Sequence, residues 1–129
     1  MRLASQTVVL LVDDDDELRA ILELALSGLP DAEVLSASSG EQALVLLRSR
    51  PIDLLFTDFR MGGMTGLNLL SHIREEHLTP ALGSVMMSGE ADESLPSRAR
   101  DAGAIAFWRK PVSPVKLRRF VLTSRGDDK

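Results

Sequence analysis

The sequence contains no cysteine, and this absence excludes disulfide bonds, thiol nucleophiles and thiolate metal sites. A chain without cysteine fits a reducing compartment, so we expect a cytoplasmic protein. Long apolar runs are also lacking, because the longest aliphatic run is Val8–Val12 and four aspartates follow it at once. So short a run fits neither a membrane span of about 20 residues nor the core of a signal peptide.

Positive charge is scarce in the first half of the chain. Residues 1–64 carry five basic and eleven acidic side chains, whereas residues 65–129 carry ten and eight, so the halves are −6 and +2 within a net charge of −4. Aromatic residues make up only 4% of the chain, and no basic stripe is interleaved with them. Because phosphate contacts provide most of the affinity for nucleic acids, we expect no direct binding to them.

The remaining composition is that of an ordinary globular protein. The 129 residues are 44% hydrophobic and 26% charged, which indicates a single domain with one core. We place the core at about residues 7–122 and interpret residues 123–129 as a polar tail.

Five apolar segments predict strands, at residues 7–12, 33–37, 52–57, 84–87 and 104–107. Helical patterns alternate with these strands. Because right-handed crossovers join parallel neighbours, the alternation predicts a doubly wound α/β fold, with helices on both faces of a parallel sheet.

The expected helices have recognisable faces and caps. The first has its apolar face at Leu18, Ile21, Leu22, Ala25 and Leu29. The second begins with a capping box from Ser38 to Glu41, the third is capped by Thr65, the fourth covers residues 92–102 and the fifth is capped by Ser113.

Polar side chains follow four of the predicted strands: Asp13 and Asp14, Asp58, Ser88 and Lys110. In a doubly wound fold, the carboxyl ends of the strands meet at one edge of the sheet, where ligands bind. Carboxylates crowded in one pocket raise each other's pKa unless a cation intervenes, and a hard divalent ion, preferably Mg²⁺, suits such oxygen ligands. With a lysine and a hydroxyl added, the set matches what a phosphoryl group needs.

These residues carry a resemblance to a known family. From about Val8 to Val121 the chain resembles the receiver domain of two-component response regulators, including chemotaxis regulators. The matching pieces are Val12-Asp13-Asp14, then Asp58 with Met61, Gly63, Met64 and Gly66 behind it, then Ser88, Ala102-Gly103-Ala104 and Lys110-Pro111.

The resemblance implies a flavodoxin-like sheet of order 2-1-3-4-5 with five helices. It implies that Asp58 accepts a phosphoryl group from a sensor histidine kinase or a phosphotransfer protein. Asp13, Asp14 and Asp58 would bind Mg²⁺, with the backbone carbonyl of Arg60 as a further ligand. The chain would then be a signalling receiver and not an enzyme, limited to its own phosphorylation and slow dephosphorylation.

The resemblance also suggests how a signal leaves the site. Lys110 and Ser88 would bind the phosphoryl oxygens, and Ser88 would move on activation. Phe107 falls where the family has an aromatic ring that swings inward, although plain core packing is the alternative for it. A downstream protein would bind the face of the fourth helix, fifth strand and fifth helix. The peptide bond before Pro111 would be cis. Whether the chain forms a homodimer is left open.

Two positions depart from the family pattern. Gly62 stands where proline is usual, so we expect a more mobile loop behind Asp58, and Thr65 replaces a common aspartate as a helix cap. Arg60 and Glu90 lie where side chains of this family overhang the site. We hypothesise that these two side chains pair across its mouth and slow the entry of the hydrolytic water.

Two other functions stay open. Asp13-Asp14-Asp15 contains the Asp-x-Asp pattern of haloacid-dehalogenase-type phosphatases, which would make Asp13 the nucleophile, although those enzymes leave no equivalent of Asp58. The second is a degenerate receiver that binds a partner without phosphorylation. Asp15 and Asp16 are interpreted as a helix start, because carboxylates favour the positive end of a helix.

Overall fold

The computed structural model describes residues 6–127 of the chain. Strands and helices alternate in the order β1 (Thr7–Val12), α1 (Asp16–Leu26), β2 (Ala32–Ala37), α2 (Gly40–Ser49), β3 (Leu54–Asp58), α3 (Gly66–Glu75), β4 (Gly83–Ser88), α4 (Leu95–Asp101), β5 (Ala106–Arg109) and α5 (Pro114–Ser124). Among these described residues, no helix has the length and apolar character that a bilayer span requires.

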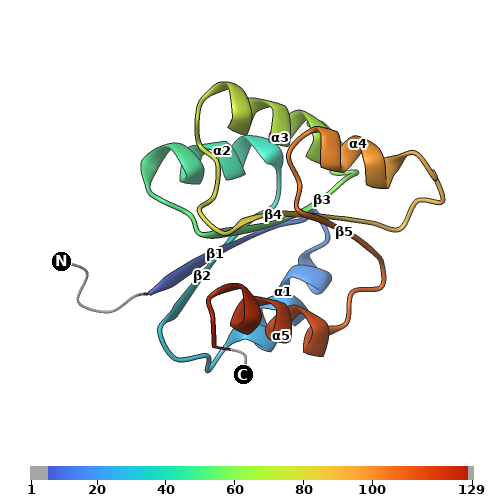
Figure 1. Cartoon of the computed structure of the whole chain (residues 1–129). Helices are drawn as coiled ribbons and strands as arrows, with labels where there is room; N and C mark the ends of the chain where they lie inside the picture. The colour runs from blue at the N-terminus through green and yellow to red at the C-terminus, as the bar shows by residue number, and fades with distance from the viewer. Residues whose placement is uncertain (1–5, 128–129) are drawn as a thin grey trace.

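The strands form one sheet of order β2-β1-β3-β4-β5, and every neighbouring pair is parallel. Helices α1 and α5 cover one face, and α2, α3 and α4 cover the other (Figure 1). The prediction of a doubly wound, flavodoxin-like fold is confirmed. The strand order reverses beside β1, so the carboxyl ends of β1 and β3 flank the place where such folds bind ligands.

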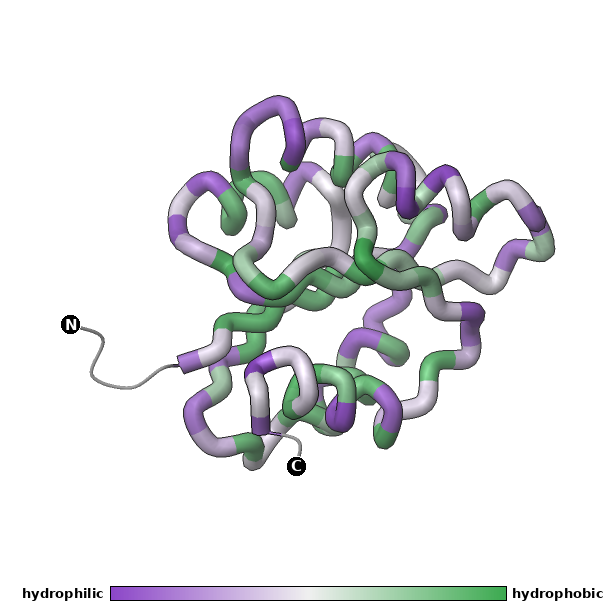
Figure 2. Tube along the Cα trace, in the orientation of Figure 1, coloured by the Kyte–Doolittle hydropathy of each residue, from purple (hydrophilic) through white to green (hydrophobic). Residues whose placement is uncertain are grey.

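The central strand β1 is buried along its whole length, because helices cover both of its faces. Val8, Leu10 and Val12 pack toward α2, α3 and α4. Val9 and Leu11 point the other way, into the layer of α1 and α5. Figure 2 shows the result as an apolar sheet between helices that carry their polar residues outward. A continuous apolar run therefore becomes a strand with two buried faces.

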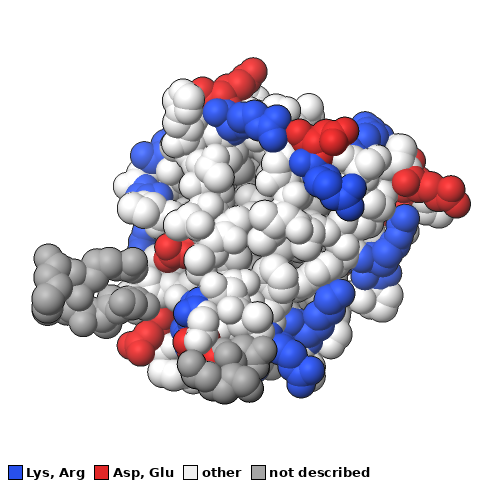
Figure 3. Space-filling model, viewed as in Figure 1, with Lys and Arg blue, Asp and Glu red and all other residues white. Residues whose placement is uncertain are grey.

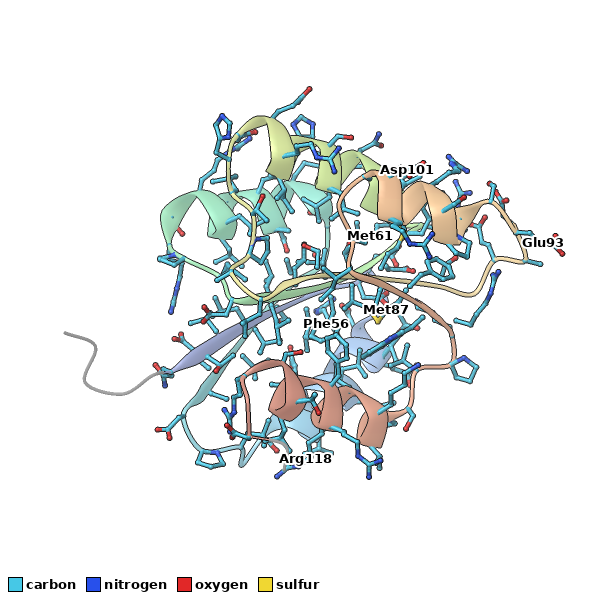
Figure 4. All side chains as sticks on the ribbon, in the orientation of Figure 1. Phe56, Met61, Met87, Glu93, Asp101 and Arg118 are labelled. Atoms are coloured by element: carbon cyan, nitrogen blue, oxygen red, sulfur yellow. The ribbon has the colours of Figure 1, made fainter. Side chains whose placement is uncertain are left out.

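Three aromatic rings fix the side of the sheet that faces α5. Phe56 of β3 lies 5.5 Å from Trp108 of β5 and 6.0 Å from Phe120 of α5, measured between ring centroids. Trp108 and Phe120 meet edge to face at 5.0 Å. Figure 4 shows Phe56 between the sheet and α5, with Met61 on the opposite side of the sheet. The cluster thereby fixes β3 and β5, the strands that lead to Asp58 and Lys110.

Helix α1 begins as expected, and its predicted apolar face packs inward at Leu18, Leu22, Ala25 and Leu29. Asp15 is its N-cap, and its carboxylate accepts hydrogen bonds from two main-chain N–H groups of the first turn. The apolar face was predicted wrongly at Ile21, which is 50% exposed, whereas Leu26 is buried. The helix carries apolar residues on more than one side, so only contact with α5 decides which side is buried.

The start of α2 differs from the prediction by one residue. Ser39, not Ser38, is the N-cap, and its side chain accepts a hydrogen bond from the N–H of Gln42. The side-chain oxygen of Gln42 in turn accepts from the N–H and hydroxyl of Ser38. The predicted box with Glu41 is therefore wrong: two adjacent serines offered two registers, and with Ser39 as the N-cap it is Gln42, not Glu41, that lies three residues further on.

Two elements near the end of the chain lie elsewhere than predicted. Strand β5 begins two residues later, at Ala106, because Gly103 makes a turn with φ of 113° and Ile105 is still more than half exposed. Helix α4 is shorter than 92–102, since Asp92 caps a turn at Ser94 before Pro96, which has no N–H, enters the first helical turn. Helix α5 runs to Ser124, into the segment interpreted as a tail.

Candidate functional site

Four strands deliver polar residues to the carboxyl edge of the sheet. Asp13 directly follows β1, Asp58 and Ser88 end β3 and β4, and Lys110 directly follows β5. The parallel register places Asp58 opposite Met87 and Ser88 opposite Arg109. The predicted convergence of residues that are far apart in the sequence is therefore present.

The ammonium group of Lys110 lies between two buried carboxylates. Its Nζ is 2.9 Å from Oδ2 of Asp13 and 3.2 Å from Oδ1 of Asp58. Asp13 is 1% exposed and Asp58 is 6% exposed. The same Asp58 oxygen accepts a hydrogen bond from the N–H of Phe59 at 2.9 Å. One cation thus serves two anions that have almost no contact with water.

This crowding shifts the protonation of the site. Burial, together with the charge of Asp13, raises the pKa of Asp58 to about 6, while Lys110 and the N–H of Phe59 oppose the shift. Burial disfavours the charge of Lys110, yet the hydrogen bond that Lys110 donates to Asp13 and the charge of Asp58 keep the pKa of Lys110 above its ordinary value. The site holds more negative charge than its lysine balances, and an additional cation would relieve the excess.

The carboxylates are placed to share such a cation. One oxygen from each of Asp13, Asp14 and Asp58 lies within 4.8 Å of the others, and Asp14 is exposed while the other two are buried. A set of three carboxylate oxygens open to water on one side suits a hard divalent ion that keeps part of its hydration. The residues therefore fit Mg²⁺ by donor chemistry and by the excess of negative charge. The role of the Arg60 carbonyl stays a prediction.

Arg19 of α1 supports this acidic loop, and the sequence analysis missed it. Its Nη1 donates to the main-chain oxygen of Asp13 at 2.8 Å and pairs with the carboxylate of Asp16 at 2.9 Å. The N–H of Asp15 donates to Oδ1 of Asp13 at 2.9 Å, which ties the loop from its other end. The three-residue spacing of Asp16 and Arg19 on one helix was the available signal.

The loop after β4 is joined to the loop after β3 beside the site. Arg60 and Glu90 form a two-pronged ion pair of 2.6 and 3.1 Å, as hypothesised from the sequence. The Arg60 hydrogen bond holds the pKa of Glu90 below its usual range. Arg109 donates to the main-chain oxygen of Glu90, and the hydroxyl of Ser88 accepts from the N–H of Glu90 at 3.0 Å. The hydroxyl of Ser88 is thereby tied to the loop, while its main-chain oxygen accepts from the N–H of Lys110 at 2.9 Å.

The remaining predicted residues take more peripheral places. Phe107 is half-buried against α4's side of the core, with the guanidinium of Arg109 stacked 5.3 Å from its ring centroid. The Lys110-Pro111 bond is cis. Asp15 and Asp16 belong to the start of α1 and not to the carboxylate cluster.

Two glycines shape the loop behind Asp58. Gly62 has φ of 81°, a value closed to proline, whose ring holds φ near −65°. At Gly66 a side chain would press directly against the main-chain oxygen of Asp58, so the start of α3 can approach β3 only with glycine there. The departure at Gly62 thus reflects a different backbone, and the greater mobility expected of this loop stays a prediction.

Comparison with known proteins identifies the relatives of this chain. The family described as "Response regulator receiver domain" matches residues 9–122. The chemotaxis protein CheY of Pseudomonas aeruginosa is 33% identical over 113 residues, which are 88% of this chain and 91% of that protein. The response regulator protein PilR of the same species is 33% identical over 120 residues, 93% of this chain but only 26% of PilR.

The fold comparison agrees with the sequence comparison. A response regulator from Thermotoga maritima superposes with a TM-score of 0.78 at 28% identity, over 92% of this chain and 97% of that one. The chain thus spans nearly all of some relatives and about a quarter of the longer regulator PilR.

Proposed function

The chain belongs to the response regulator receiver domain family of two-component systems, and from this premise we propose that Asp58 accepts a phosphoryl group from a histidine kinase or a phosphotransfer protein. The observation that carries the proposal is the placement of Asp58, which is buried, 3.2 Å from the Lys110 ammonium and clustered with two further carboxylates. A surface aspartate without these neighbours would have no means of stabilising a phosphoryl group. The compartment that fits such a donor is the cytoplasm.

The transfer step balances with the groups of the chain and its donor. A carboxylate oxygen of Asp58 bonds to phosphorus, the bond between phosphorus and the donor's imidazole nitrogen breaks, and its electron pair stays on that nitrogen. Mg²⁺ bound by Asp13, Asp14, Asp58 and the Arg60 carbonyl would neutralise charge on the phosphoryl oxygens. Lys110, which follows β5, supplies the second positive charge. Water later cleaves the acyl phosphate and regenerates Asp58, so the chain modifies itself and is not an enzyme for a separate substrate.

Phosphorylation would then exchange hydrogen bonds at the mouth of the site. The hydroxyl of Ser88 now accepts from the N–H of Glu90, and it would turn to donate to a phosphoryl oxygen. The group adds roughly two negative charges, which draw Lys110 and Ser88 toward it. The loop that begins at Glu90 loses this tie to β4. We propose that the resulting shift of α4, β5 and α5 regulates a downstream protein, with Phe107 following the movement of Ser88.

The test is the mass of the intact protein after incubation with acetyl phosphate, with and without Mg²⁺. We expect a gain of one phosphoryl group that needs Mg²⁺ and is absent from Asp58→Asn. Asp53→Asn makes the same chemical change at the other end of β3 and is the matched control, which should still gain the group.

Two results would overturn the proposal. A phosphoryl group that persists in Asp58→Asn and maps to Asp13 would indicate phosphatase-like chemistry. No gain in the folded protein from acetyl phosphate or from a panel of histidine kinases would indicate a receiver that binds its partner without phosphorylation.

A further inference from the structure

Glu90, in the loop after β4, is held by groups from three different parts of the sheet. Its main-chain N–H donates to the hydroxyl of Ser88, the last residue of β4, at 3.0 Å. Its carboxylate pairs with Arg60, which lies in the loop after β3. Its main-chain oxygen accepts a hydrogen bond from Arg109, the last residue of β5. Each polar group of Glu90 therefore has a partner, and the three partners belong to three neighbouring strands or the loops behind them.

Arg109 contacts this loop with a side chain that is itself held in place. It is exposed and lies opposite Ser88 in the register of β4 and β5. Its guanidinium stacks 5.3 Å from the ring centroid of Phe107, two residues earlier on the same face of the strand. Figure 3 shows acidic and basic side chains close together at the right of the molecule, where Figure 4 labels Glu93 in the same loop. The hydrogen bond to Glu90 thus comes from a cation that the aromatic ring orients.

We propose that Arg109 is a positioning residue that slows the phosphorylation of Asp58 by holding Glu90 in its present place. This inference rests on the proposed function, in which the hydroxyl of Ser88 leaves the N–H of Glu90 and turns to the phosphoryl group. Because Arg109 holds the main-chain oxygen of the same residue, the N–H of Glu90 separates from Ser88 more easily once that second hydrogen bond is absent. A hydrogen bond from a charged donor is stronger than a neutral one, so Arg109 favours the arrangement that precedes phosphorylation.

Two simpler roles of Arg109 predict a different result when its side chain is removed. A cation beside the site attracts an anionic phosphodonor, so the loss of its charge alone would slow the reaction. The loss of a contact that only stabilises the fold would lower the free energy of unfolding without making the reaction faster. Release of Glu90, in contrast, predicts faster phosphorylation. The sign of the change in rate therefore separates the positioning role from the other two.

The experiment compares the parent protein with Arg109→Ala in two measurements. The first is the rate at which acetyl phosphate with Mg²⁺ adds a phosphoryl group, followed by intact mass. We expect the variant to react about fivefold faster, which is the effect that one net hydrogen bond supports. The second is the hydrogen exchange of the Glu90 N–H in the unphosphorylated protein, followed by NMR. This exchange should rise by a similar factor, because the N–H is released from Ser88 more often.

Two further variants control for charge. Arg98→Ala removes an arginine that contacts the same loop, at the carboxylate of Asp92 at 3.4 Å and the hydroxyl of Ser94 at 3.5 Å, and neither contact involves Glu90. We expect both measurements in Arg98→Ala to match the parent. Arg109→Lys keeps the positive charge but loses the planar group that stacks on Phe107. Its rate of phosphorylation should lie between those of the parent and Arg109→Ala.

Equal or slower phosphorylation of Arg109→Ala would overturn the inference, as would an equal acceleration in Arg98→Ala. If the parent is phosphorylated and Arg109→Ala changes neither measurement, only the role of Arg109 is refuted. If acetyl phosphate and a panel of histidine kinases leave the parent unmodified while Arg109→Ala alone speeds the exchange of the Glu90 N–H, the proposed function fails and Arg109 still positions the loop. Failure of both measurements refutes both proposals.

Discussion

Strand β3 is preceded by Asp53 and ends at Asp58, and the two carboxyl groups do different work. Asp53 accepts a hydrogen bond from the main-chain N–H of Val8 at 2.8 Å, which joins β1 to the start of β3. Asp58 shares one ammonium group with Asp13, and burial raises its pKa to about 6. One carboxylate stabilises the fold, and the other is held where its ionised form is unfavourable.

The same contrast extends to the two edges of the sheet. At the amino edge, Arg125 donates to the main-chain oxygens of Pro30 and Asp31, and Arg50 pairs with Glu33. At the carboxyl edge, Arg19 donates to the oxygen of Asp13, close to an excess of negative charge. Similar hydrogen bonds thus secure a chain connection at one edge and a binding site at the other. Each test below pairs a change at the carboxyl edge with its counterpart at the amino edge.

The largest expected effect is the stability gained in Asp58→Asn without metal. With a folded pKa near 6 against an ordinary 3.8, the ionised carboxylate is unfavourable in the folded protein by about 3 kcal/mol at neutral pH. This penalty is absent below pH 3.8, grows as pH rises to 6 and is then constant. We therefore expect urea midpoints in EDTA to diverge between pH 4 and 7, with the variant more stable. Asp53→Asn is the control, and a similar divergence there would contradict the assignment to Asp58.

The next effect concerns two glycines. Gly66→Ala would press a methyl group against the main-chain oxygen of Asp58, so we expect a loss of about 2 to 3 kcal/mol and impaired phosphorylation. Gly28→Ala, at the amino edge, meets no atom within 4 Å and carries only the strain of its φ of 83°, about 1 kcal/mol. Urea unfolding measures both. If the two losses were equal, close approach of α3 would not be the reason for Gly66.

A smaller effect is expected for Arg19→Lys on Mg²⁺ binding. Lysine keeps the charge, but its shorter side chain and tetrahedral ammonium replace the planar guanidinium whose Nη1 contacts both the Asp13 oxygen and the Asp16 carboxylate. Loss of such outer support typically weakens metal binding by about tenfold. The fluorescence of Trp108 during a Mg²⁺ titration measures the affinity, with Arg125→Lys as the control at the other edge. Unchanged affinity in Arg19→Lys would show that its charge alone matters.

The smallest effect is expected at the mouth of the site. Arg60→Ala or Glu90→Ala removes the ion pair between the loops that follow β3 and β4, and we expect the phosphoryl group to be lost a few times faster, because water enters more freely. Arg50→Ala removes a similar two-pronged pair with Glu33 at the amino edge and should leave the lifetime unchanged. Loss of the phosphoryl group is followed by intact mass after the donor is removed. If Arg60→Ala does not shorten the lifetime of the phosphoryl group, the hypothesis that the ion pair slows the entry of water is refuted.

Local signals predicted most of the elements and the positions of the site residues. The run Val8–Val12 before Asp13, and the similar runs before Asp58 and Ser88, mark strand ends, because a buried strand must end where charge begins. The misplaced features have two causes. Packing against α5 decided which side of α1 is buried, whereas hydrogen bonds of Gln42 decided the start of α2 and the turn at Gly103 decided the start of β5.

The sequence by itself determined the alternation of strands and helices, and hence the edge at which Asp13, Asp58, Ser88 and Lys110 meet, because hydrophobic periodicity is a local property of the chain. Only the tertiary structure decided the distances, the shared lysine and the raised pKa of Asp58. It also decided the support that Arg19 gives to the loop of Asp13. These depend on which side chains lose water together, and that is settled only when elements far apart in the sequence pack.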